Sequence, residues 1–213
     1  RDHLNKILSG PIGAEIMEAT RKTTSVKTLS YWERGPRHVT NSKRAINIPD
    51  DVKGLKLRTP PEELPMAIWR AMGAGPTPMA FGELFTALQQ KVVDGQENPL
   101  ALIASSKFSE VQPYLALTYH TWAPAAFVIS DKKFSQMSPE NQKIMVEAAK
   151  ETAAYQNDLV QKNEDKLVKD LEKAGMKVSR PDLKLFREAT KDVHLKFDSM
   201  YTKELYDKIQ NTK

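Results

Sequence analysis

One stretch of sequence decides the fold of this chain: Gly73-Ala-Gly-Pro-Thr-Pro-Met-Ala-Phe-Gly-Glu-Leu-Phe-Thr-Ala-Leu-Gln-Gln-Lys-Val-Val-Asp-Gly-Gln-Glu-Asn-Pro99. It predicts a proline-bounded strand at 77–81, a short amphipathic helix at 83–90, and a strand at 92–94 that ends in an Asp-Gly turn. Three polar residues follow the turn in one run: Gln96, Glu97 and Asn98. Polar side chains that follow such tight turns are typical of a ligand site.

The residues before this stretch extend the same pattern. A strand at 55–58 is stopped by Thr59-Pro60-Pro61, because proline cannot donate to a sheet and disfavours helix in the residue before it. A helix at 62–72 follows and ends at Gly73. Strands and helices that alternate in this way predict a parallel sheet with right-handed crossovers, and therefore an α/β lobe.

The longest periodic segment begins at Ser138-Pro139, where serine is a good N-cap and proline suits the first helical position. Apolar or small residues recur every three or four positions up to Gly175, which predicts a helix at 139–174 that is about 54 Å long. A helix of this length bends, spans two lobes as a shared spine, or pairs with a copy as a coiled coil. Gln156 and Asn163 interrupt the apolar stripe, which disfavours the coiled coil.

The other predicted elements are shorter. They are helices at 11–20 and 181–209, strands at 26–32, 114–122, 126–130 and 176–179, and a polar crossing segment at 36–43.

The composition limits the function classes. The chain has 213 residues, a formal net charge of +5 and no cysteine, which excludes disulfides, thiolate metal sites and cysteine nucleophiles. The charge is spread along amphipathic helices, which favours a solvated surface over nucleic-acid binding. No apolar run is long enough to span a bilayer, and Arg1-Asp-His is not the start of a signal peptide. We expect a globular protein without metal or cofactor.

Arg58 is the clearest candidate site residue. It lies at the carboxyl end of a predicted parallel strand, which is the edge where ligands bind in open α/β sheets. A guanidinium is always charged and offers a planar fork that matches a carboxylate. The alternative interpretation is an ordinary surface arginine at a strand end.

The run at 96–98 is the second candidate site. Its amides and carboxylate provide hydrogen-bond donors and acceptors directly after a tight turn. Alternatively, Pro99 starts a helix and Asn98 is only its N-cap.

A looser set of residues lies near these two candidates. Arg37 belongs to the crossing segment, whose residues would line a cleft between lobes, and Arg44 follows this segment. Trp32 and Trp122 are candidates for an apolar wall, although core burial is the commoner fate of tryptophan.

Motifs of known catalytic sites are missing from the sequence, which favours a binding protein over an enzyme. His120 fits a hydrogen-bonded structural residue better than a catalytic one. An enzyme that uses Glu97 or His120 as acid or base stays as the alternative.

Six short segments carry a resemblance over almost the whole chain. They are Gly10-Pro-Ile-Gly13, Tyr31-Trp-Glu-Arg-Gly-Pro-Arg37, Thr40-Asn-Ser-Lys-Arg44, Lys53-Gly-Leu-Lys-Leu-Arg58, Gly73-Ala-Gly-Pro-Thr-Pro-Met79 and Asp94-Gly-Gln-Glu-Asn-Pro99. Together they resemble the extracytoplasmic solute-binding proteins of tripartite ATP-independent periplasmic (TRAP) transporters.

The resemblance implies a periplasmic solute-binding fold, in which two α/β lobes enclose a cleft and a long helix spans both. Lobe one would contain 1–36 and 124–163, and lobe two would contain 37–123 and 164–213. Pro36 stands where the family usually has an aromatic residue. Family members also begin with a signal peptide and further residues before the position of Arg1, so lobe one would lack its N-terminal part.

The resemblance also implies a site and a function. The arginine at position 58 would pair with a substrate carboxylate, Asn98 would lie near it, and Arg37 would be a second arginine that some members use. The full expected ligand-binding set is Arg58, Asn98, Arg37, Glu97, Gln96, Trp122, Phe81 and Trp32. The implied protein is a monomeric periplasmic receptor, not an enzyme, that binds a small organic acid and delivers it to TRAP membrane subunits. A third possibility is an interaction module that dimerises through its long helix.

Overall fold

The computed structural model describes residues 1–212, and contacts between residues divide them into two compact units. Unit 1 contains Arg1–Arg34, Pro124–Val160 and 198–212. Unit 2 contains Gly35–Ala123 and Gln161–Phe197. None of the helices in the described part of the chain combines the length and apolar character that a membrane span requires.

Unit 2 is built on a six-stranded mixed sheet with the order β4-β3-β5-β2-β6-β8. The strands are β2 (Pro36–Asn41), β3 (Lys56–Thr59), β4 (Gly75–Pro78), β5 (Gly95–Pro99), β6 (Tyr114–Trp122) and β8 (Lys177–Ser179). β3 runs parallel to β4 and β5, β6 runs parallel to β8, and β2 is antiparallel to both of its neighbours. Five strands therefore end at the same edge of the sheet, which we call the carboxyl edge, and β2 begins there.

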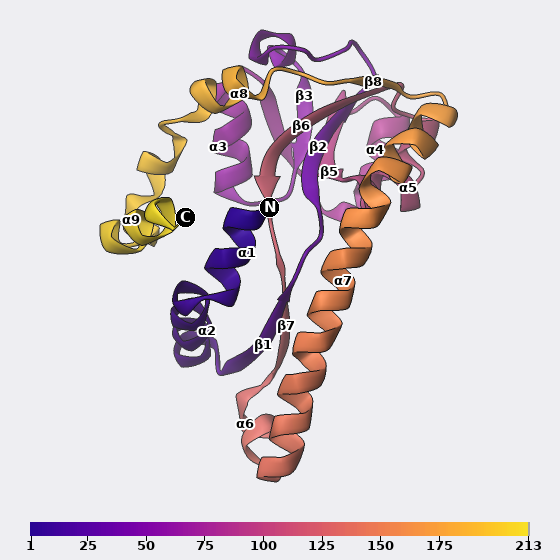
Figure 1. Cartoon of the computed structure of the whole chain (residues 1–213). Coiled ribbons are helices and arrows are strands. Elements are labelled where there is room, and N and C mark those ends of the chain that lie inside the picture. Colours follow the sequence, from indigo (N-terminus) through magenta and orange to yellow (C-terminus); the bar gives the residue numbers. More distant parts are fainter. Residues whose placement is uncertain (213) are drawn as a thin grey trace. The chain divides into compact units, whose positions relative to one another are not determined.

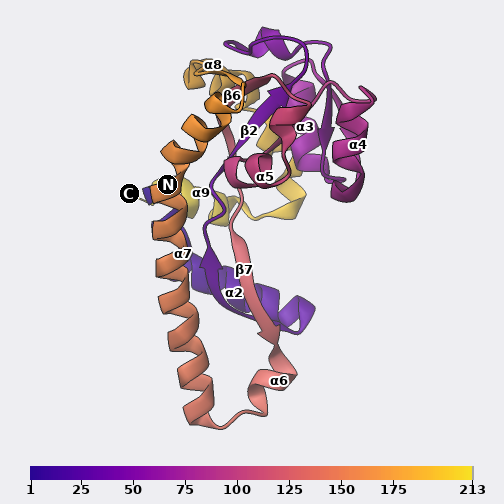
Figure 2. The same cartoon turned by 90° about the vertical axis from the view of Figure 1, so that its right-hand side faces the viewer.

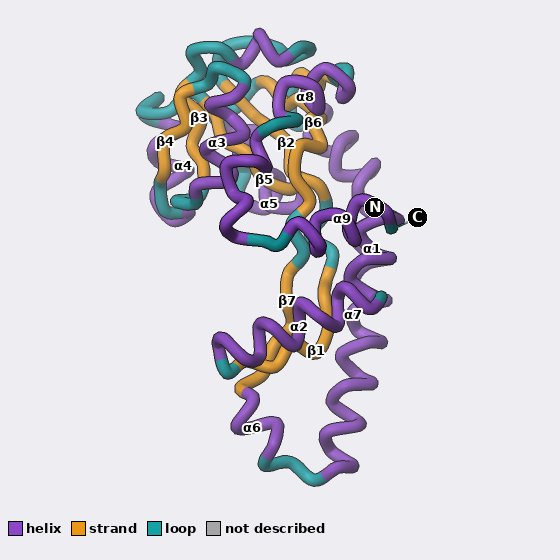
Figure 3. Tube along the Cα trace, turned by 90° about the vertical axis from the view of Figure 1, so that its left-hand side faces the viewer, coloured by secondary structure: helices purple, strands orange, loops and turns teal. Residues whose placement is uncertain are grey.

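Each face of this sheet has its own hydrophobic core. Leu57 and Val39 pack on one face with Trp69 of α3 (Glu63–Ala71) and Phe186 of α8 (Leu183–Thr190). The alternating residues, such as Leu115, point to the other face. There they meet α4 (Leu84–Gln89), α5 (Leu100–Ser105) and the C-terminal part of α7 (Pro139–Lys173). Helices thus cover both faces, as an α/β architecture requires, and Figure 3 shows the strands in orange among these helices.

Short 3₁₀ turns complete unit 2: η1 (Pro49–Val52), η2 (Phe81–Glu83) and η3 (Phe108–Glu110). A fourth, η4 (Val193–Met200), contains a kink at Phe197, where the backbone angles are not helical. The predicted helix at 181–209 is therefore wrong, because α8, η4 and α9 (Lys203–Asn211) are separate elements.

The predicted α/β pattern is confirmed in its central part, where β3, β4 and β5 are parallel. The strand predicted at 92–94 is wrong, since these residues form the turn that precedes β5. The prediction of a crossing segment at 36–43 is also wrong, because Pro36–Asn41 forms the fully buried strand β2. Its sequence holds a single aliphatic residue, Val39, so hydrophobic periodicity could not reveal it.

Unit 1 contains the antiparallel pair β1 (Val26–Trp32) and β7 (Ala125–Ser130). Figure 2 shows β7 leading into α6 (Asp131–Ser135), which packs Phe134 against Leu29 of β1 and Ala149 of α7. The helices α1 (Asp2–Ser9) and α2 (Pro11–Thr24) precede β1.

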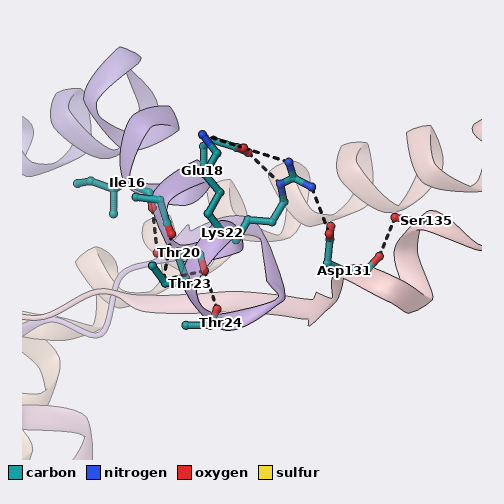
Figure 4. A network of polar contacts seen from close by, with 10 residues as sticks. Ile16, Glu18, Thr20, Lys22, Thr23, Thr24, Asp131 and Ser135 are labelled. Carbon is teal, nitrogen blue, oxygen red and sulfur yellow. Dashed lines mark hydrogen bonds and ion pairs between the residues drawn. The ribbon is translucent and has the colours of Figure 1, made fainter.

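A polar network joins the end of α2 to the start of α6 (Figure 4). The Arg21 guanidinium donates to both oxygens of Glu18 (2.9 and 3.0 Å) and to Asp131 Oδ2 (3.1 Å). The backbone N–H of Asp131 also donates to the Ser25 carbonyl, at 3.1 Å. The charged groups are partly exposed, so we expect this network to contribute little stability and mainly to fix the position of the turn.

The long helix is confirmed as α7, which Figure 1 shows as a single helix. It has 35 residues, and Ser138 Oγ accepts from the Asn141 N–H at 3.3 Å. Its residues up to Val160 belong to unit 1 and those from Gln161 to unit 2.

The C-terminal segment differs from the expected domain boundaries. The sequence places 198–213 in lobe two, whereas contacts place 198–212 in unit 1. Two contacts explain the difference: Lys208 pairs with Glu15 of α2 at 3.3 Å, and the His3 ring meets the Ile209 carbonyl at 2.8 Å.

Gly95 should be the least replaceable glycine of unit 2. A Cβ at this position would lie 2.2 Å from the Thr40 carbonyl oxygen and 2.9 Å from Leu57 Cδ2. Because the nearest obstacle is the backbone of β2, we expect Gly95→Ala to lower the free energy of unfolding by about 3 kcal/mol, measured by urea denaturation. Gly82→Ala is the control, since a Cβ there meets nothing within 4 Å. Equal stabilities of the two variants would contradict the close approach of β2 and β5.

Candidate functional site

The candidate residues of unit 2 gather at the carboxyl edge of its sheet. Arg58 is the last residue but one of β3, and Asn98 is the last but one of β5. His120 is close to the end of β6, and Arg37 is the second residue of β2, which begins at this edge. Strand order therefore brings together residues that lie far apart in the sequence.

Arg58 is almost completely buried, with 3% of its surface exposed. Its Nε and Nη2 both donate to the Met79 carbonyl, at 2.9 and 2.7 Å, and the Phe81 ring lies 5.9 Å from the guanidinium carbon. Burial lowers the pKa of Arg58, and the nearby charge of Arg37 adds to this effect, while Glu97 opposes it. An arginine remains protonated in spite of such a shift. The surface-arginine interpretation is therefore wrong, and the structure holds a buried cation in a fixed orientation.

Arg37 and Glu97 form the closest ion pair of the site. Arg37 Nε donates to Glu97 Oε2, and Nη2 donates to Glu97 Oε1 at 2.7 Å. Nη2 also reaches the Glu97 carbonyl (2.6 Å) and Asn98 Oδ1 (3.1 Å). Such a two-pronged contact fixes the plane of the guanidinium.

His120 also contacts the Glu97 carboxylate. Its Nε2 lies 3.0 Å from Glu97 Oε2, its Nδ1 lies 2.7 Å from Thr118 Oγ1, and its ring packs edge to face against Trp69. Burial alone would raise the pKa of Glu97, but hydrogen bonds from His120 and Arg37, with their charges, outweigh burial and lower it. Glu97 is thus held as a carboxylate, and His120 is hydrogen-bonded as the sequence predicted.

Asn98 is not a helix cap. The N-cap of α5 is Pro99, and the helix begins at Leu100. The Asn98 side chain instead accepts from Arg37 and donates to Gln96 Oε1, at 2.6 Å. Gln96 has no exposed surface and donates to Thr40 Oγ1 at 2.9 Å. The residues at 96–98 therefore form a buried polar cluster on β5.

The aromatic candidates occupy different places. Phe81 is 46% exposed beside Arg58. Trp122 and His120 line a cavity of about 390 Å³ between β6, α3 and α8. Trp32 belongs to unit 1, where it stacks on Phe127 with ring centroids 5.1 Å apart.

Arg44 has a structural role, because it donates to the carbonyls of Asp51 and Lys53.

Sequence reasoning missed several buried polar residues of unit 2: His38, Thr40, Gln112 and Thr118. The first two alternate along β2 on one face, which is a strand signal, but polar residues with this spacing normally indicate a solvated face. Residues 1–212 contain no group of three or more His, Cys, Asp or Glu residues suited to a metal ion.

His38 should make stability depend on pH. Its ring has no exposed surface, and burial, followed by the charge of His120, lowers its pKa to about 3. In the unfolded chain this pKa is about 6.5. Between the two values the unfolded state binds a proton that the folded state does not, so stability falls as the pH falls.

We expect a loss of about 2 kcal/mol in the free energy of unfolding between pH 7 and pH 5, measured by urea denaturation. Protonation of Glu97 would change the free energy of unfolding only below about pH 4.5, where carboxylates begin to bind protons. The His38→Gln variant should lose this pH dependence, whereas His3→Gln, at an exposed position, should keep it. A pH slope that survives His38→Gln would contradict the assignment.

Open α/β sheets bind ligands at the carboxyl ends of their strands, and the planar fork of arginine matches a carboxylate. The chain belongs to the bacterial extracellular solute-binding proteins of family 7, whose family model matches residues 1–200. The expected TRAP resemblance and fold class are confirmed by this match and by the solved structures below.

One relative is the 2,3-diketo-L-gulonate-binding periplasmic protein of Escherichia coli, which is 39% identical over 188 residues. The match covers 88% of this chain and 57% of that protein, so the chain spans less than two thirds of the relative's length.

Two solved structures of TRAP periplasmic solute-binding proteins have the same fold. The protein from Polaromonas sp. JS666, bound to D-erythronate, is 38% identical with a TM-score of 0.93. The protein from Roseobacter denitrificans, bound to β-D-glucuronate, is 31% identical with a TM-score of 0.94. Each match covers the whole of this chain and about 70% of the other chain, namely 70% and 71%.

Proposed function

We propose that the protein containing this chain is an extracytoplasmic receptor for a small organic carboxylate. The observation that carries the proposal is Arg58, a buried guanidinium fixed at the carboxyl edge by two hydrogen bonds to the Met79 carbonyl. These bonds use Nε and Nη2, so Nη1 is the donor best placed for a ligand oxygen. A charge-assisted hydrogen bond suits a carboxylate in this position.

Sugar acids are the class of ligand that we favour. D-Erythronate and β-D-glucuronate, bound by the two related proteins, both carry a carboxylate and several hydroxyl groups. Arg58 would bind the carboxylate, and Asn98, Gln96 and Glu97 would provide amide and carboxylate partners. Arg37, Phe81, Trp122 and Trp32 complete the proposed ligand-binding set.

The transport role follows from the family. Units 1 and 2 would correspond to the two lobes of the family, and α7 contributes residues to both units. A ligand that favours a closed form would shift the population towards the state that TRAP membrane subunits recognise. The receptor would act as a periplasmic monomer without catalysis.

Thermal unfolding of the intact protein with D-erythronate tests the function. A ligand at 100 times its Kd stabilises the folded state by about 2.7 kcal/mol, so we expect a clear rise in Tm. Erythritol is the control, because it keeps hydroxyl groups but lacks the carboxylate. Equal responses to the two compounds, or none to a panel of sugar acids, would contradict the proposal. Recovery of the acid unchanged by mass spectrometry separates a receptor from an enzyme that uses Glu97 or His120.

A further inference from the structure

A single line of hydrogen bonds runs through the interior of unit 2. Arg37 Nη2 donates to Asn98 Oδ1 at 3.1 Å, and Asn98 Nδ2 donates to Gln96 Oε1 at 2.6 Å. Gln96 Nε2 donates to Thr40 Oγ1 at 2.9 Å, and Thr40 Oγ1 donates to Gln112 Oε1 at 3.1 Å. All five side chains are buried, and three of them, Gln96, Thr40 and Gln112, have no exposed surface.

Both ends of this line fix its direction. Arg37 can only donate hydrogen bonds. At the other end, Gln112 Nε2 donates to the carbonyls of Val111 (3.1 Å) and Asp94 (3.5 Å), which can only accept. The carboxamides of Asn98, Gln96 and Gln112 therefore have one consistent orientation. Turning any of them over would set two donors or two acceptors against each other, at a cost of about 1–3 kcal/mol for each buried group left unsatisfied.

The two ends of the line lie at opposite edges of the sheet. Asn98 is close to the carboxyl edge, beside Arg37. Gln112 precedes β6, whose first residue, Tyr114, pairs with the last residue of β2, Asn41. Gln112 is thus at the edge away from Arg58, where it has no access to a ligand held by that arginine.

We propose that Gln112 is a positioning residue that, together with Arg37 at the other end of the line, holds the Asn98 carboxamide in its orientation through Thr40 and Gln96. The inference rests on the proposed function, in which Asn98 faces an acid ligand. An amide nitrogen has two N–H groups, and Asn98 uses one for Gln96. The fixed orientation presents the other to the ligand, which suits a carboxylate or hydroxyl oxygen. If the Asn98 carboxamide were turned over, its Oδ1 would face the ligand oxygen, and two hydrogen-bond acceptors would then oppose each other.

The test is a double-mutant cycle in the intact protein, with D-erythronate as the probe and titration calorimetry as the measurement. We expect Gln112→Met to lower affinity about tenfold in the natural background. In the Asn98→Ala background the same change should lower affinity less than twofold, because Gln112 acts through Asn98. Equal losses in both backgrounds would show a general structural effect and overturn the proposal. Gln90→Met, at an exposed position, is the control and should leave affinity unchanged.

A second readout does not need a ligand. We expect Gln112→Met to shift the side-chain amide resonances of Asn98 in NMR spectra and to speed their exchange with water, while Gln90→Met does neither. If Gln112→Met fails to fold, Thr40→Val breaks the next link with little change in volume and takes its place. Unchanged Asn98 resonances would overturn the proposal. If D-erythronate does not bind to the natural protein, the proposed function is at fault, and the NMR result still decides the role of Gln112.

Discussion

Replacing Arg58 by alanine in the intact protein is expected to lower the affinity for D-erythronate by tenfold to a hundredfold. A charge-assisted hydrogen bond contributes about 1.5–3 kcal/mol, and 1.4 kcal/mol corresponds to a factor of ten. The effect should be large because Arg58 is held in place before a ligand arrives, by two bonds to the Met79 carbonyl. Titration calorimetry measures the change directly.

Two further variants make this prediction specific. Arg58→Lys keeps the positive charge but loses the planar fork, so we expect an intermediate affinity. Arg70→Ala is the matched control, since Arg70 is an exposed arginine of α3 whose partner is Glu63 at 3.4 Å. Unchanged affinity in Arg58→Ala, with the Tm of the ligand-free protein preserved, would rule out the carboxylate contact.

Replacing Glu97 by alanine is expected to lower the free energy of unfolding by about 3–5 kcal/mol, because the change leaves a buried charge without its partner. The Glu97 side chain is 2% exposed and lies between Arg37 and His120. Glu97→Gln should cost less, since an amide still accepts hydrogen bonds from Arg37. Urea denaturation at pH 7 measures both variants.

The exposed ion pair of Glu63 and Arg70 is the control for the buried ion pair of Arg37 and Glu97. Glu63→Ala removes an exposed partner of Arg70 and should change stability by less than about 1 kcal/mol. The double variant Arg37→Ala/Glu97→Ala should lose less stability than the sum of its single changes, because it removes both charges. A Glu97→Ala protein as stable as Glu63→Ala would mean that the ion pair does not hold the strands together.

Local signals account for the elements that the sequence predicted well. Ser138-Pro139 and Gly175 mark the limits of α7 because capping depends on a few neighbouring residues. Arg58 could be placed at a strand end because Pro60 and Pro61 stop the strand directly after it. The turns around Gly73 and Asp94 likewise indicated an α/β unit before any contact was known.

The polar interior could not be predicted in the same way. Strand β2 looks like a crossing segment, because five of its six residues are not aliphatic, yet all six are buried. The buried Thr40 hydroxyl is tolerated because Gln96 of β5 and Gln112, which precedes β6, are its hydrogen-bond partners. The N-cap reading of Asn98 failed for the same reason, since Arg37, its partner, is 61 positions away.

The sequence by itself determined local features of this protein: the long helix α7, the strands β1, β3 and β6, and the arginine near the end of β3. It did so because helix caps, prolines and apolar spacing act within a few residues. Only the tertiary structure decided that β2 lies at the centre of the sheet, that Glu97 sits between Arg37 and His120, and that Gln112 is linked to Asn98. These arrangements join residues 23 to 72 positions apart, and a buried polar group is stable only when such distant partners satisfy its hydrogen bonds.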